Sequence, residues 1–96
     1  MNTKTALKKI LDELLVDEYP QVKEISISGR EFLLPKEDGF GSETRTQFDI
    51  FLYGNLASMD DEEMRELKNA TKRIGSYVLG HNERIFNVFV IYDPKN

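Results

Sequence analysis

Residues 44–53 read TRTQFDIFLY, and this stretch decides the fold because its residues alternate with the period of two that is typical of a β-strand. The alternation places Phe48, Ile50 and Leu52 on one face, which is apolar throughout. The opposite face begins polar and becomes aromatic, with Gln47, Asp49, Phe51 and Tyr53. The stretch therefore predicts a strand that is buried on one face and carries a polar-to-aromatic gradient on the other.

The preceding segment predicts a partner strand. Residues 22–28 include Glu24-Ile25-Ser26-Ile27-Ser28, which alternates in the same way, and Gly29 then indicates a bulge. Residues 35–42 read PKEDGFGS and have the turn chemistry of a long hairpin tip. We expect residues 22–34 and 44–53 to pair as an antiparallel hairpin.

Two helices and a third strand flank this hairpin. Residues 4–16 place leucines and Ile10 at helical spacing, so we expect an amphipathic helix that ends before Tyr19-Pro20. A second helix is predicted to begin at a cap on Ser58 and to end at Gly80 in a left-handed conformation. Residues 84–92 read RIFNVFVIY and predict a strand with apolar residues on both faces.

The order of these elements predicts one α+β domain over residues 1–96. A right-handed crossover through the second helix makes the third strand parallel to the second. We therefore expect a two-layer sandwich of order α-β-β-α-β, with a three-stranded mixed sheet and both helices on one face.

Composition narrows the functional classes. The formal net charge is −4 and there are no cysteines, so structural disulfides and thiolate nucleophiles are excluded and binding to nucleic acid or anionic membranes by bulk attraction is disfavoured. The first residues do not form the apolar run of a secretory signal. We expect a cytoplasmic protein that does not associate with membranes.

Catalytic motifs are not found in the sequence. It has one histidine, His81, and neither a nucleophile elbow nor a glycine-rich phosphate loop. The acidic run at residues 60–63 has the charge expected at a helix start and lacks the spacing of a calcium loop. We expect no enzyme activity, cofactor or metal site, and chemistry by Asp49, Tyr53 or His81 is the weaker alternative.

The face of the sheet that the helices leave open carries the main candidate site. Alternation in the second and third strands predicts an apolar set there, consisting of Phe51, Tyr53, Ile85, Phe89 and Ile91. We interpret these residues as partner-binding, with a second copy of the chain or another protein as the leading candidates. Coverage by the hairpin tip around Phe40 and stacking of nucleobases are the alternatives. This pattern predicts a non-enzymatic, acidic protein–protein interaction or accessory domain.

The second helix offers a different surface. Arg65, Lys68 and Lys72 are spaced three and four residues apart, and Arg73 flanks them, so they could contact phosphates or an acidic partner. The element order resembles the type II KH topology, and residues 46–93 are similar to ribosome-binding factor A, although the G-x-x-G nucleotide clamp is not found in the sequence. This resemblance implies an RNA- or ribosome-associated module, which is the alternative function.

Overall fold

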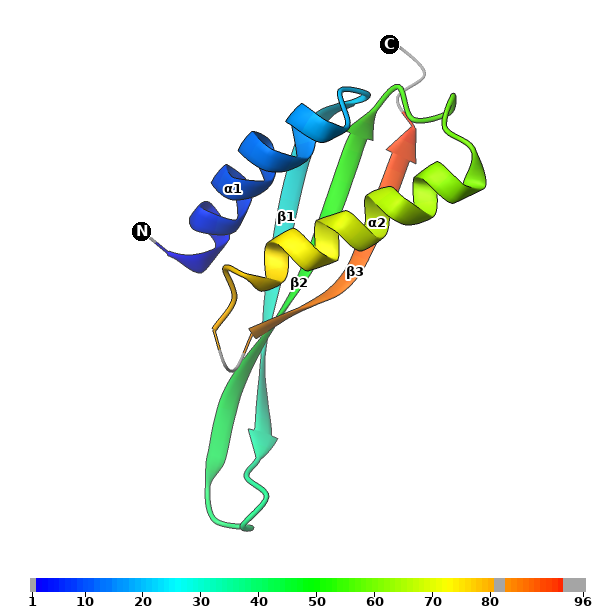
Figure 1. Ribbon diagram of the computed structural model, residues 1–96. Helices are drawn as coiled ribbons and strands as arrows, with labels where there is room; N and C mark the ends of the chain where they lie inside the picture. Colours follow the sequence, from blue (N-terminus) through cyan, green and yellow to red (C-terminus); the bar gives the residue numbers. More distant parts are fainter. Residues whose placement is uncertain (1, 81–82, 93–96) are drawn as a thin grey trace.

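The computed structural model describes residues 2–80 and 83–92 and contains the expected elements in the expected order. They are α1 (Thr3–Glu18), β1 (Val22–Pro35), β2 (Ser42–Gly54), α2 (Asp61–Ser76) and β3 (Glu83–Tyr92). The three strands form one sheet of order β1-β2-β3, antiparallel between β1 and β2 and parallel between β2 and β3. Both helices lie on the same side of this sheet (Figure 1). The predicted α+β class and its α-β-β-α-β order are confirmed.

The core lies between the helices and one face of the sheet. Leu7, Leu11 and Leu15 of α1 are fully buried, as their spacing predicts. The sheet contributes Ile25, Ile27, Phe48, Ile50, Leu52 and Val88. The alternation in β1 and β2 therefore assigns the buried face of both strands correctly.

The start of α2 differs from the sequence prediction. The cap is Asp60, whose carboxylate accepts from the Glu63 amide at 2.8 Å while the Glu63 side chain accepts from the Asp60 amide at 3.3 Å. Ser58 instead donates its hydroxyl to the Asn55 carbonyl. The reciprocal pair with Glu63 satisfies two amides at once, so the helix starts at the acid rather than at the serine. The far end also differs, because α2 ends at Ser76 and Gly80 is not left-handed.

The irregular points of the sheet lie elsewhere than predicted. β1 is continuous through Gly29, and its register with β2 shifts only between Val22 and Glu24. The second irregularity is in β3, because Ile85 pairs with Phe48 whereas the next pair joins Asn87 to Asp49. One extra residue therefore lies in β3 between these pairs. Such a bulge moves the side chains that precede it to the opposite face of the sheet from the one that simple alternation predicts.

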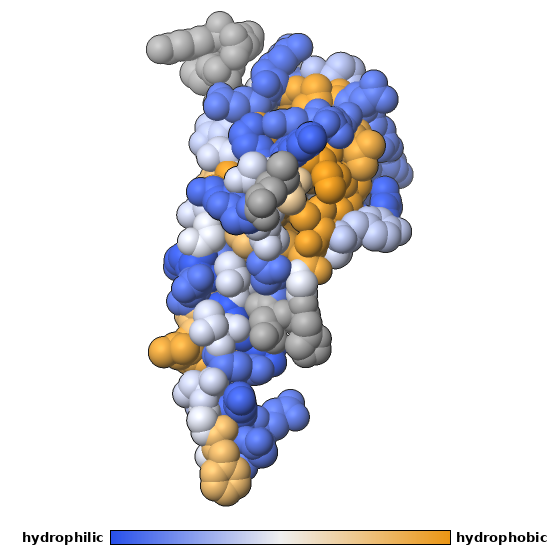
Figure 2. Space-filling model, turned by 90° about the vertical axis from the view of Figure 1, so that its left-hand side faces the viewer, coloured by the Kyte–Doolittle hydropathy of each residue, from blue (hydrophilic) through white to orange (hydrophobic). Residues whose placement is uncertain are grey.

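A two-stranded arm extends from the body. Pairing between β2 and β3 begins at Thr46 and Glu83, so residues 32–35 and 42–45 pair only with each other around the turn at 36–41. The molecule measures 50 × 27 × 21 Å, and Figure 1 shows the arm as the narrow end of its long axis. In Figure 2, orange apolar atoms stand out along this arm and at its tip as well as on the body.

None of the described helices combines the length and apolar character that a membrane crossing requires.

Gly54 is the last residue of β2, and its substitution provides a test of this fold. Its φ of 153° is unfavourable for other residues, and a Cβ there would collide with the Gln21 carbonyl oxygen. We predict that Gly54→Ala lowers the free energy of unfolding by at least about 2 kcal/mol, measured by urea denaturation.

The control is Gly39→Ala at the arm tip. Gly39 also has a positive φ of 80°, but a Cβ there would meet no atom within 4 Å. Its cost is expected to be only about 1 kcal/mol. An equal decrease in the free energy of unfolding in the two variants would contradict the close approach of Gly54 to the backbone at the start of β1.

Candidate functional site

Four of the five residues predicted for the open face lie together on it. Phe51 is the register partner of Phe89, and Tyr53 is the register partner of Ile91. The rings of Phe51 and Phe89 are stacked, with centroids 5.1 Å apart and planes inclined by 17°. These four residues, called the apolar cluster below, project on the side opposite the buried Ile50 and Leu52.

The apolar cluster is exposed. Phe89 retains 42% and Ile91 36% of their accessible surface, and Phe51 and Tyr53 are half-buried. The hairpin tip extends away from the body and does not fold over the cluster (Figure 1). Phe40, which lies in this tip, is 81% exposed. Within the described residues, the predicted alternative of coverage by this tip is therefore wrong.

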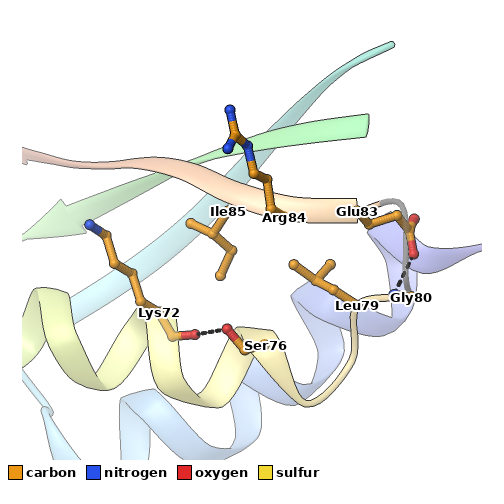
Figure 3. A pocket seen from close by; sticks show the side chains of 7 residues that line it. All are labelled: Lys72, Ser76, Leu79, Gly80, Glu83, Arg84 and Ile85. Carbon is orange, nitrogen blue, oxygen red and sulfur yellow. Dashed lines mark hydrogen bonds between the residues drawn. The ribbon is translucent and has the colours of Figure 1, made fainter. Parts of the chain in front are cut away.

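Ile85, the fifth predicted residue, lies on the other face of the sheet. It packs against the core, and a Cβ added at Gly75 of α2 would meet its Cδ1 atom. Figure 3 shows Ile85 pointing towards α2 and Arg84 pointing away from it. The bulge in β3 explains why Ile85 does not lie on the open face. It shifts the residues before it by one position, so their side chains exchange faces relative to simple alternation.

A row of polar side chains borders the apolar cluster. Arg30, Gln47 and Arg84 are register partners across the three strands, and Asp49 lies between this row and Phe51 along the same face of β2. With its amide oxygen turned towards Arg84, Gln47 accepts from Nε of that residue at 3.2 Å. We call these four residues the polar band.

Sequence reasoning considered Asp49 but missed both arginines of the polar band. The alternation of β1 could have placed Arg30 on the open face. Placing Arg84 there required the register of β3, which the sequence alone does not give. The structure thus combines an apolar surface with charged donors and acceptors at its edge.

Asp49 has an incomplete set of partners. Its side chain is only 16% exposed, and Nη2 of Arg30 lies 3.6 Å from Oδ2, which is an ion pair but too long for a hydrogen bond. Oδ1 is buried and has no hydrogen-bond partner in the described part of the chain. A buried carboxylate oxygen without a donor favours a ligand that supplies one.

The four basic residues predicted as a possible phosphate or acidic-partner contact lie on α2. Arg65, Lys68, Lys72 and Arg73 are all exposed. Lys72 borders a cavity of about 260 Å³ between α2 and β3 (Figure 3). Arg73 borders a different depression, which it shares with Glu18 and Glu66. Contact of these residues with phosphate or an acidic partner stays a prediction.

The phenol of Tyr19 lies near two acidic residues and one arginine. Burial and the nearby Glu18 and Glu66 raise the pKa of Tyr19, whereas Arg73 opposes this effect, so its phenol remains protonated near neutral pH. Residues 2–80 and 83–92 contain no group of three acidic or histidine side chains that could hold a metal ion. His81 lies outside the described residues.

Comparisons with known proteins identify the fold. No protein-family model and no curated protein matches the sequence. The organic hydroperoxide resistance protein OhrB of Bacillus subtilis matches 93% of this chain with a TM-score of 0.57 and 15% identity. An organic hydroperoxide resistance protein from Elizabethkingia anophelis matches 95% of it with a TM-score of 0.60 and 14% identity.

A third solved structure has a similar fold. It is an organic hydroperoxide resistance protein, OsmC, from Legionella pneumophila, described as a predicted redox protein, and it matches 93% of this chain with a TM-score of 0.51 and 9% identity. At these low identities, the TM-scores show a shared fold and nothing more. The chain spans about three fifths of the length of these proteins, namely 63%, 62% and 60%.

These neighbours correct the functional expectation. We expected a non-enzymatic, protein-binding domain, or an RNA- or ribosome-associated module of KH type. Both expectations were wrong, because the solved structures that share the fold are hydroperoxide resistance proteins rather than interaction or RNA-binding modules. The resemblance failed because its element order and apolar positions occur in many α+β domains.

The bulge in β3 can be tested by placing a charge on either side of it. We predict that Ile85→Asp lowers the free energy of unfolding by about 3 kcal/mol or more, because the carboxylate would face the core beneath α2. Ile91→Asp, on the open face, is expected to cost only about 1 kcal/mol. Thermal denaturation of both variants measures these costs. A similar decrease in the free energy of unfolding for Ile85→Asp and Ile91→Asp would contradict this register.

Proposed function

We propose that this chain is a domain of the organic-hydroperoxide-resistance type that binds organic hydroperoxides on its open sheet face. The observation that carries the proposal is the position of the stacked Phe51–Phe89 pair beside Asp49, whose Oδ1 oxygen has no hydrogen-bond partner among the described residues. An organic hydroperoxide has an apolar body and an –OOH group that donates one hydrogen bond. Its two ends therefore match the apolar cluster and the polar band.

The apolar cluster supplies the contact for the organic body. Phe89 and Ile91 keep more than a third of their surfaces exposed, so a bound hydrocarbon would remove apolar surface from water on both sides of the contact. The flat, stacked arrangement of the two rings favours an aromatic or branched alkyl group.

The polar band supplies the contact for the –OOH group. Oδ1 of Asp49 could accept its hydrogen, which would relieve an unpaired acceptor that costs about 1–3 kcal/mol when buried. The Arg30 guanidinium is 61% exposed and borders the same carboxylate. A movement of this exposed side chain would bring N–H donors to the peroxide oxygens.

Reduction of the bound peroxide needs a reductant that this chain lacks. Conversion of ROOH to ROH and water breaks the O–O bond and consumes two electrons and two protons. A dithiol can supply both while it becomes a disulfide, but the chain contains no cysteine. We propose that a dithiol from another molecule acts as the reductant and that this chain binds and orients the peroxide.

The fold likeness supports this substrate class, since proteins titled organic hydroperoxide resistance proteins have the same arrangement of elements. A cytoplasmic location is part of the proposal and is supported by the acidic, cysteine-free composition.

Binding can be tested by NMR titration with cumene hydroperoxide. We expect shifts of the Phe51 and Phe89 ring resonances and tighter binding of the hydroperoxide than of cumene, which has no –OOH group. Phe89→Ala should weaken binding by roughly 3- to 10-fold, because one side of the stack is lost. Asp49→Asn should remove the preference over cumene, whereas Asp61→Asn at the start of α2 should leave it unchanged.

Two results would contradict the proposal. The first is an equal affinity for cumene and its hydroperoxide in the unmodified chain. The second is steady consumption of hydroperoxide by the purified chain without added thiol, which would show that the reductant is not external.

A further inference from the structure

The cavity of about 260 Å³ between the end of α2 and the start of β3 lies on the helix side of the sheet, away from the apolar cluster (Figure 3). An apolar cavity of about 150 Å³ is large enough to hold benzene. Sites for drug-sized ligands have volumes of roughly 300–1,000 Å³. The cavity therefore has the size of a site for a small organic molecule.

The bulge in β3 determines which side chains line this cavity. Because the bulge shifts the residues before it, Ile85 points towards α2 and Arg84 points away from it (Figure 3). Leu79, from the segment that follows α2, supplies a second apolar side chain. Both Ile85 and Leu79 are partly buried and pack against the edge of the core. The middle of the cavity thus has apolar walls.

The two ends of the cavity carry opposite charges. Figure 3 shows Lys72 at one end and Glu83 at the other, with Ile85 and Leu79 between them. The carboxylate of Glu83 already accepts from the Gly80 amide at 2.7 Å. The ammonium group of Lys72 has no hydrogen-bond or ion-pair partner among the described residues. The charge that is available to a ligand is therefore the positive one.

This arrangement of charges gives a bound ligand a direction. Backbone carbonyls at the end of a helix carry partial negative charge, and Glu83 adds a full negative charge at the same end of the cavity. An anionic group is repelled from that end and attracted to Lys72. Ser76 also lines the cavity, but its hydroxyl donates to the Lys72 carbonyl at 2.7 Å. Lys72 is thus the group that would hold an anion.

A single lysine favours an anion with one charge. Phosphate groups carry up to two charges, and paired N–H donors of arginine match their geometry. Arg84, the arginine beside this cavity, points away from it (Figure 3). A carboxylate has one charge and matches the one ammonium group of Lys72.

We propose that this cavity binds a small organic carboxylate. The carboxylate contacts Nζ of Lys72, and an aromatic or branched apolar body packs against Leu79 and Ile85. The apolar contact removes surface of both molecules from water, and the ion pair fixes the orientation. This inference goes beyond peroxide binding and does not depend on it, because the two sites lie on opposite sides of the sheet.

The test is an NMR titration of the full chain with benzoate. Benzamide serves as an uncharged analogue of the same shape, and benzylamine serves as a cationic analogue. Benzoate should shift the methyl resonances of Leu79 and Ile85 with a dissociation constant of about 1 mM or below, and it should leave those of Ile91 unchanged. Benzamide and benzylamine should each bind about threefold or more weakly, because neither forms the ion pair with Lys72.

Three variants separate the charges. Lys72→Gln should lower the affinity for benzoate to that for benzamide, about threefold or more, and should leave benzamide binding unchanged. Lys68→Gln is the matched control, because Lys68 is exposed on the same helix and is not among the described residues that line the cavity. It should change neither affinity. Glu83→Gln keeps an oxygen that can accept from the Gly80 amide and loses the negative charge, so benzoate should bind at least as tightly.

Several results would overturn the inference. The first is that benzoate binds to the unmodified chain no more tightly than benzamide or benzylamine does, or shifts only resonances of the open face. The second is that Lys72→Gln and Lys68→Gln have equal effects. The third is that Glu83→Gln binds benzoate more weakly while its circular dichroism remains that of the folded chain. The first comparison uses the unmodified chain, so it does not depend on the folding of any variant.

Discussion

The central position of β2 determines the rest of the structure. This strand pairs antiparallel with β1 and parallel with β3, so its own alternation sets which side of the sheet is buried. Phe48, Ile50 and Leu52 face both helices and are buried. Because both helices are used on this side, the face that carries Phe51 and Asp49 has no covering layer from the described chain (Figure 1). The apolar cluster is thus a direct consequence of how β2 is placed.

Sequence patterns predicted the elements whose signals are local. Periods of 3.6 and two identified α1, β1 and β2, and they assigned Leu7, Ile25 and Phe48 to the core. The bulge in β3 escaped prediction because Ile85 and Phe86 are both apolar, so the simple alternation allowed either of them to face the core. The start of α2 escaped because Ser58 and Asp60 are both good caps, and the reciprocal bond with Glu63 distinguishes them only in three dimensions.

The candidate site was predictable in part. Four residues of the open face follow from alternation, whereas the meeting of Arg30, Asp49 and Arg84 depends on cross-strand register. The function was not predictable in this way, because the order of elements is compatible with several protein classes. At identities of 9–15% the solved structures establish the fold, so the chemistry has to come from the residues themselves. The sequence contains no cysteine, which is why binding and reduction are assigned to different molecules.

Solvent paramagnetic relaxation by a soluble gadolinium chelate tests most directly whether the alternation of β2 buries one face of the sheet and leaves the other uncovered. The account predicts strong broadening of the Phe89 and Ile91 side-chain resonances and little broadening of the Ile50 and Leu52 resonances. Strong broadening of Ile50 and Leu52, or protection of Phe89 and Ile91, would contradict the account.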